Sequence, residues 1–269
     1  MLGYAGRHSE EPEKSLEAHL AARGAHGPAR APVTAADPQD AVPSAVGALY
    51  DSRRRAHYAK PALRGWLHLI WFAASLITGP LLVVHVHGAG RVIALAIYAV
   101  SVTSLFGISA LYHRGTWAPA WHRRLQRLDH LMIFFLIAGT ATPVYLIAVH
   151  GAARWAGLTA IWALTLAAAI IHLAWMGAPE VLVGSTFIGL GLAGGLALPA
   201  VWLHAGLGPG LLMAAGGLLY IGGAVSYHYR WLDPSPAVFG YHESFHVCVC
   251  AAATCQFLAI VLLAARVTG

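Results

Sequence analysis

Residues 128–149 read LDHLMIFFLIAGTATPVYLIAV, a stretch in which Asp129 is the only Asp, Glu, Lys or Arg. A helix needs about 20 consecutive, mainly apolar residues to cross the hydrocarbon core of a bilayer. This stretch is long and apolar enough to do so, and its single carboxylate stands at one end. The stretch is therefore typical of a membrane-spanning helix.

Six other segments after residue 64 have a similar length and composition. Together the seven segments cover residues 66–86, 91–113, 128–149, 155–175, 181–203, 208–229 and 241–265. The links between them are short and contain Gly, Pro, Arg and polar residues, as turns do. The sequence thus predicts an all-α polytopic membrane protein, with a bundle of seven transmembrane helices in residues 59–269.

The composition excludes an ordinary soluble domain. The chain is 58% hydrophobic and only 10% charged, whereas soluble domains are about 25% charged. Seven of its eleven acidic residues lie in the first 51 positions, which leaves four for the other 218. So few carboxylates could not cover the surface of a soluble domain of that size.

The basic residues indicate the orientation of the helices. Residues 1–58 are rich in Ala, Pro, Gly, Glu and Arg without a sustained apolar pattern, which predicts a disordered tail. With the N-terminus inside, ten Lys and Arg flank the inner helix ends and three flank the outer ends. This excess predicts a cytoplasmic N-terminus and explains the net charge of +6 without nucleic acid.

Several ionisable residues fall at the predicted cytoplasmic ends of different helices. His113 ends the second segment, Asp129 opens the third, and His242 and His246 open the seventh. An ionisable group in a membrane span is costly, so it is a candidate functional residue. Two histidines four positions apart project from one helix face, and a third imidazole would complete a three-histidine zinc site.

Two further residues are candidates at this site. Asp129 could hold or deprotonate a water molecule beside the metal, and Ser109, one turn before His113, could donate a hydrogen bond to a substrate oxygen. Glu243 completes the pattern His-Glu-x-x-His, in which Glu is the general base of a metalloprotease. We prefer a supporting role for Glu243, because it points about 100° away from His242 around the helix.

The sequence also resembles the bacterial haemolysin III proteins, which belong to the progestin and adiponectin receptor superfamily. The resemblance covers roughly residues 58–265. The residues that carry it are Arg64-Gly65-Trp66-Leu67-His68, Ser109-x-x-x-His113, Arg127-Leu128-Asp129-His130, Ile137-Ala138-Gly139-Thr140 with Thr142-Pro143, and Phe239-Gly240-Tyr241-His242-Glu243 with Phe245-His246. It implies seven helices, zinc held by His113, His242 and His246, a zinc-bound water contacted by Asp129, and a place for Ser109 beside them.

These observations lead to a functional hypothesis. We expect a multi-pass protein of the bacterial plasma membrane, with membrane lipids as partners, that uses zinc to hydrolyse lipid amides or esters in lipid homeostasis. Asp129 and Ser109 would be the catalytic residues. Three other classes stay open: a non-enzymatic receptor or sensor with structural zinc, a pore-forming haemolysin, and an intramembrane metalloprotease. Two other histidines are noted, His68 as an interhelical hydrogen-bonding residue and His228 as a spare ligand.

Overall fold

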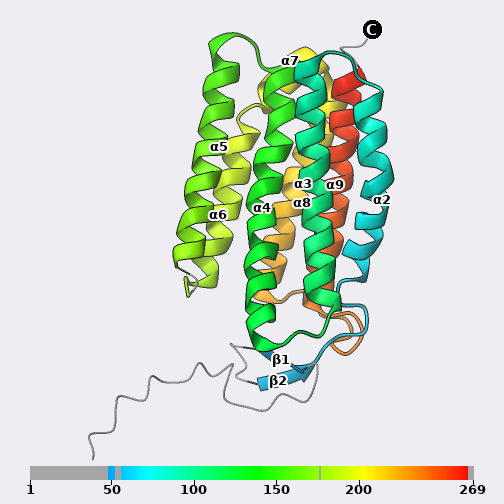
Figure 1. Cartoon of the computed structure of the whole chain (residues 1–269), viewed down its shortest axis with the longest axis vertical. Coiled ribbons are helices and arrows are strands. Elements are labelled where there is room, and N and C mark those ends of the chain that lie inside the picture. The colour runs from blue at the N-terminus through cyan, green and yellow to red at the C-terminus, as the bar shows by residue number, and fades with distance from the viewer. Residues whose placement is uncertain (1–47, 52–55, 176, 266–269) are drawn as a thin grey trace, which may run out of the picture. The chain divides into compact units, whose positions relative to one another are not determined.

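The structure is a computed structural model, and it describes residues 48–51, 56–175 and 177–265 (Figure 1). Seven spans in this part of the chain are long and apolar enough to cross a membrane, which confirms the predicted fold class. The helices are α2 (Trp66–Val84), α3 (Ala89–Arg114), α4 (Pro119–Ala148), α5 (Gly151–Ala174), α6 (Glu180–Gly195), α7 (Leu198–Ala205), α8 (Leu207–Tyr229) and α9 (Tyr241–Ala265).

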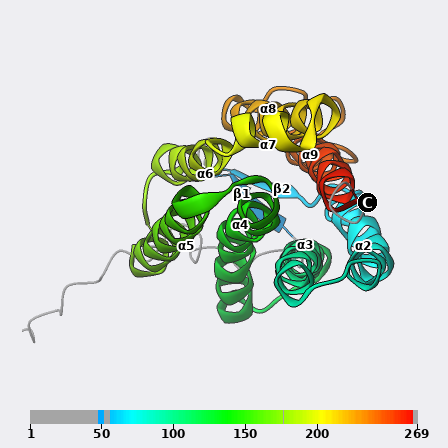
Figure 2. The same cartoon turned by 90° about the horizontal axis from the view of Figure 1, so that it is seen from above.

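The helices follow one another around the bundle in chain order, and α9 packs against α2 (Figure 2). Helix α4 also contacts α6, α7 and α9, and it is the most buried of the seven spans. The helix that carries Asp129 therefore has protein around much of its surface.

Two helix boundaries differ from the prediction. Helix α4 begins at Pro119, nine residues before the apolar stretch at 128, because proline is favoured in the first turn and the polar turns that follow can lie outside the hydrocarbon. The fifth span is two helices, since α6 ends at Gly195 and α7 begins at Leu198. Glycines favour such a break, and Pro199 fits the first turn of α7.

Two short strands precede the bundle. Strands β1 (Ala48–Asp51) and β2 (Ala56–Ala59) pair antiparallel, with Leu49 opposite Tyr58. The sequence predicted no regular structure before residue 59, so this hairpin differs from the prediction, although its tyrosines are typical strand residues. The rest of the predicted tail, residues 1–47 and 52–55, lies outside the described residues.

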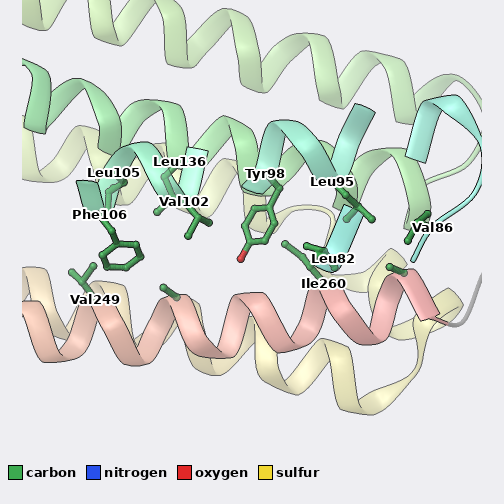
Figure 3. Close-up of a cluster of buried hydrophobic side chains, with 12 residues drawn as sticks. Leu82, Val86, Leu95, Tyr98, Val102, Leu105, Phe106, Leu136, Val249 and Ile260 are labelled. Atoms are coloured by element: carbon green, nitrogen blue, oxygen red, sulfur yellow. The ribbon is translucent and has the colours of Figure 1, made fainter. Parts of the chain in front are cut away.

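The largest apolar core lies mainly between α3 and α9 (Figure 3). Tyr98, Phe106 and Ile260 are almost fully buried there. By contrast, many large apolar side chains are exposed on the bundle, among them Ile77 and Leu218. Such extensive exposed apolar surface is unusual for a water-soluble monomer, and it suits contact with lipid tails.

Helices α3 and α4 approach closely at Gly139. A Cβ atom added there would lie 2.6 Å from the Cβ of Ser101 on α3, and Ser101 is held by a 2.7 Å hydrogen bond from its hydroxyl to the Tyr98 carbonyl oxygen. Small residues allow this kind of approach between membrane helices.

We expect Gly139→Ala to destabilise the protein by about 1–3 kcal/mol, because the added methyl group must push the two helices apart. The matched control is Gly217→Ala in α8, where an added Cβ meets no atom within 4 Å. Thermal unfolding of both variants in the same detergent measures the effect. Equal midpoints for the two variants would contradict the close packing at Gly139.

Candidate metal centre

Three histidines meet at one end of the bundle. His113 is the last residue but one of α3, and His242 and His246 lie in the first two turns of α9. The Nε2 atoms of His113 and His242 are 3.3 Å apart. One nitrogen from each of the three rings lies within 4.8 Å of the others. The residues that the sequence placed at one site do lie together.

The chemistry and spacing of these rings fit a metal ion. Neutral imidazole nitrogens bind zinc at about 2.0–2.1 Å, so two ligands of a tetrahedral ion lie about 3.3 Å apart. His113 and His246 are buried and His242 is half-buried, which shields the group from bulk solvent. Three protein ligands leave one coordination position for another group, as in catalytic zinc sites.

Asp129 and Ser109 lie beside the three histidines. The Oδ2 atom of Asp129 is 3.8 Å from the Nε2 atom of His113, and Ser109 is buried on α3, four residues before His113. Nδ1 of His68, on α2, is 2.8 Å from the Ser109 hydroxyl oxygen. The site thus joins residues from α2, α3, α4 and α9, and the interhelical hydrogen bond predicted for His68 is present.

Both carboxylate oxygens of Glu243 have partners other than the three histidines. Its side chain is 1% exposed and forms an ion pair with Arg64 through Oε1. Its other oxygen, Oε2, accepts a 2.8 Å hydrogen bond from the backbone N–H of Gly240. A general base needs an oxygen that can reach the reacting water. Because both oxygens have partners, this arrangement favours a supporting role over that of a protease base.

The segment before α2 packs against the ends of α3 and α9. The backbone N–H groups of Ala62 and Leu63 donate 3.1 Å hydrogen bonds to the carbonyl oxygens of residues 237 and 238. Gly65 has φ +79°, and a Cβ there would lie 2.9 Å from the Cβ of His113. The Arg64 ion pair is part of the same junction, so the chain around residues 62–65 contacts the helix ends that carry the three histidines.

Lys60 adds a basic group to this junction. Its Nζ donates a 3.1 Å hydrogen bond to the carbonyl oxygen of Gly115, which follows α3. Burial is the main cause that lowers the pKa of Lys60, and the charges of Arg114 and Arg64 lower it further. The sequence predicts orientation from Lys60 and Arg64, among other basic residues, and places Arg64 in a family motif, but it does not predict their contacts at the site.

The other noted histidines lie outside the group. His228 is not among the residues that could hold a metal in the described part of the chain. His130 points to α5, where its Nδ1 is 3.2 Å from Nε2 of His172. Neither residue contributes a nitrogen to the site formed by His113, His242 and His246.

The fold and this site define a class, the polytopic membrane proteins with a buried three-histidine group at one end of a seven-span bundle. A family model described as haemolysin-III related matches residues 56–257. The chain belongs to the haemolysin III family, which confirms the resemblance seen in its motifs. Hemolysin-3 of Bacillus cereus is 33% identical over 165 residues, 59% of this chain and 74% of that protein. The Hemolysin-3 homolog of Bacillus subtilis (strain 168) is 26% identical over 185 residues, 66% of this chain and 81% of that protein.

The buried ion pair between Arg64 and Glu243 can be tested by removing one partner or both. Arg64→Met or Glu243→Met alone removes one charge of a buried ion pair and should cost about 3–5 kcal/mol, whereas the double substitution should recover most of that loss. Arg114→Met is the control, because Arg114 is exposed and stacks 4.0 Å over the Trp66 ring. Unfolding in detergent measures the stability of all four variants. If the single substitutions destabilise the protein no more than Arg114→Met does, the ion pair does not contribute to stability as expected.

Proposed function

We propose that the protein is a zinc-dependent hydrolase that acts on an amide or ester bond of a membrane lipid. The observation that carries this proposal is the buried group of three imidazoles with the Asp129 carboxylate 3.8 Å from one of them. A purely structural metal site needs only its ligands. A hydrolytic metal site also needs an open coordination position and a base beside it, such as a carboxylate.

Zinc suits the residues present. Imidazole nitrogens bind zinc well, and His113, His242 and His246 leave the ion a fourth position. When bound, zinc would polarise the scissile carbonyl group and lower the pKa of a water molecule. The protein's own contribution is to hold the three nitrogens on two helix ends and to exclude bulk water around them.

Asp129 and Ser109 have separate roles in this proposal. The Asp129 carboxylate accepts a hydrogen bond from the attacking water and then its proton, which makes Asp129 the general base. Ser109, buried four residues before His113, would donate its single hydroxyl hydrogen to the substrate oxygen and so stabilise the developing negative charge.

The location of the site supports a lipid substrate. Every residue of the three-histidine group lies on a helix long and apolar enough to span a membrane, and in this proposal a substrate dissolved in the bilayer would reach the site laterally. The basic residues that flank this end of the helices favour the cytoplasmic side.

This orientation places the end of α9 outside the cytoplasm. A reporter enzyme that works only outside the cytoplasm should therefore be active when it is fused to the C-terminus. Activity of a reporter that works only inside the cytoplasm would contradict this orientation.

A second candidate is a receptor or sensor in which zinc is structural. The observation that favours it is that the ligands come from α3 and α9, which are far apart in the sequence. A bound ion would therefore clamp the second and the seventh of the spans together. This candidate requires the metal but gives Asp129 no chemical task.

We expect the purified protein to contain about one zinc ion per chain, and His242→Ala to lose most of it because two imidazoles hold zinc poorly. Metal analysis by mass spectrometry measures this. The control is His204→Ala, since His204 lies at the end of α7 and outside the group. Full zinc retention in His242→Ala would reject the metal centre.

Asp129→Asn distinguishes the hydrolase from the sensor. We expect zinc to stay bound while turnover falls about 10²–10⁴-fold, because a positioned general base contributes about that factor. Lipid profiling of membranes that contain wild-type or Asp129→Asn protein at equal levels would reveal the substrate and the product. Identical profiles would remove the main support for catalysis and favour the sensor.

A further inference from the structure

Two basic side chains lie where α3 ends, next to the three-histidine group. Lys60 is half-buried, and its Nζ donates a 3.1 Å hydrogen bond to the carbonyl oxygen of Gly115. Arg114 directly follows His113 in the chain. Its guanidinium carbon lies 4.0 Å from the centroid of the Trp66 ring. Both cations are therefore held within two residues of a proposed metal ligand.

The carboxylates at this end of the bundle have other partners. Arg64, the third cation at the junction, pairs with Glu243. Asp233 accepts a 3.0 Å hydrogen bond from the backbone N–H of the first residue of α9, and Asp129 lies beside His113. Neither of the other two cations forms an ion pair with a carboxylate of the described residues. Two positive charges thus stand together without a protein anion to neutralise them.

The contacts of Lys60 and Arg114 leave them hydrogens to donate. An ammonium group carries three N–H donors, and the bond to Gly115 takes one of them, as is common for a lysine at a helix C-terminus. A guanidinium carries five donors in a planar fork that fits a phosphate group. In the described part of the chain, the contact of Arg114 is with an aromatic ring, which takes the place of no phosphate oxygen.

The surroundings favour a phosphate that belongs to a lipid. Trp66 is 41% exposed at the start of α2, and exposed tryptophans at helix ends are typical of the headgroup level of a bilayer. Basic pockets between the ends of membrane helices bind lipid phosphates. The charges of Arg114 and Arg64 also lower the pKa of Lys60, after burial, and a bound anion would relieve this repulsion.

We propose that Lys60 and Arg114 bind the phosphate group of an anionic phospholipid, whose ester or amide bond then reaches the three-histidine group. In a phospholipid the phosphate and the acyl bond are joined by a short linker, so a headgroup held at the end of α3 brings the acyl bond close to the site. The lipid's role as a substrate rests on the proposed function. The phosphate site itself rests on the two cations.

The first arm of the test measures lipid binding to the full-length protein in detergent by native mass spectrometry. The probes are a phosphatidylglycerol with ether-linked chains, which a hydrolase cannot cleave, and the matching dialkylglycerol without phosphate. We expect the phosphate lipid to bind at least about tenfold more tightly. Lys60→Met and Arg114→Met should each weaken its binding about tenfold, because a hydrogen bond to a charged group contributes about 1.5–3 kcal/mol. Equal affinity of the wild type for both lipids would overturn the inference.

The matched control for charge is Arg124→Met. Arg124 is also exposed, and its guanidinium carbon lies 5.1 Å from the ring centroid of Trp121. Its removal measures the general attraction of basic residues for anionic lipid, which should be weaker than the effect at Arg114. If Arg124→Met and Arg114→Met lose affinity equally, the lipid is attracted by net charge alone and the proposed site is wrong.

Two further controls address packing and the source of the phosphate. Lys60→Arg and Arg114→Lys keep the positive charges and should keep most of the binding. If these variants lose as much affinity as the Met variants, altered packing causes the loss and the inference is wrong. Phosphatidylglycerol should also stay bound in a large excess of inorganic phosphate. Its displacement by inorganic phosphate would overturn a lipid as the ligand of the pair.

The second arm separates the phosphate site from the proposed function. His242→Ala removes a proposed metal ligand but should bind the ether lipid as wild type does, and a loss as large as in Arg114→Met would place the lipid at the histidines instead. If phosphatidylglycerol with ester-linked chains is turned over, Arg114→Met should raise KM more than it lowers kcat, because ground-state binding is lost. If the phosphate lipid binds as expected while Asp129→Asn leaves all lipid profiles unchanged, the proposed function fails and the phosphate site stands.

Discussion

The hydrocarbon core of a bilayer offers no hydrogen-bond partner, so a polar side chain inside the bundle must find one within the protein. Several polar groups at the site meet this condition through one another. Glu243 has Arg64 and the Gly240 N–H as partners, while Nδ1 of His68 lies 2.8 Å from the Ser109 hydroxyl oxygen. Because such groups are costly when left alone, the removal of one member affects the others as well. The three imidazoles lie within this set, which fixes the helix ends that carry them.

Packing between α3 and α4 controls the geometry of the site as much as the polar contacts do. Ser109 and His113 lie on α3, and Asp129 lies on α4. The close approach at Gly139 sets how near these two helices come. The distance between Asp129 and His113 thus depends on a glycine that lies three helical turns from the carboxylate, which shows how an apolar contact can determine the placement of polar groups.

The sequence predicted the seven spans and the meeting of His113, His242 and His246, because length and apolar composition are strong signals for membrane helices. Once the spans are known, residues at helix ends on the same side must lie at a similar depth. The break between α6 and α7 and the early start of α4 were not predicted, since hydropathy reports the membrane-embedded part of a helix and not its caps. The ion pair of Arg64 with Glu243 was missed for another reason. Its partners are 179 residues apart, and neither the charge of Arg64 nor its place in a family motif indicates which carboxylate it meets.

The junction of residues 62–65 with the start of α9 bears on how the protein is made. The chain leaves the ribosome from its N-terminus, so α2, α3 and α4 enter the membrane long before α9. Until α9 arrives, Arg64 lacks its ion-pair partner Glu243, and His113 stands without the imidazoles of His242 and His246. The group of three imidazoles is consequently completed only once α9 is in place. A nascent chain that has inserted α2 to α8 carries one of the three imidazoles and therefore lacks the arrangement that could hold a metal ion.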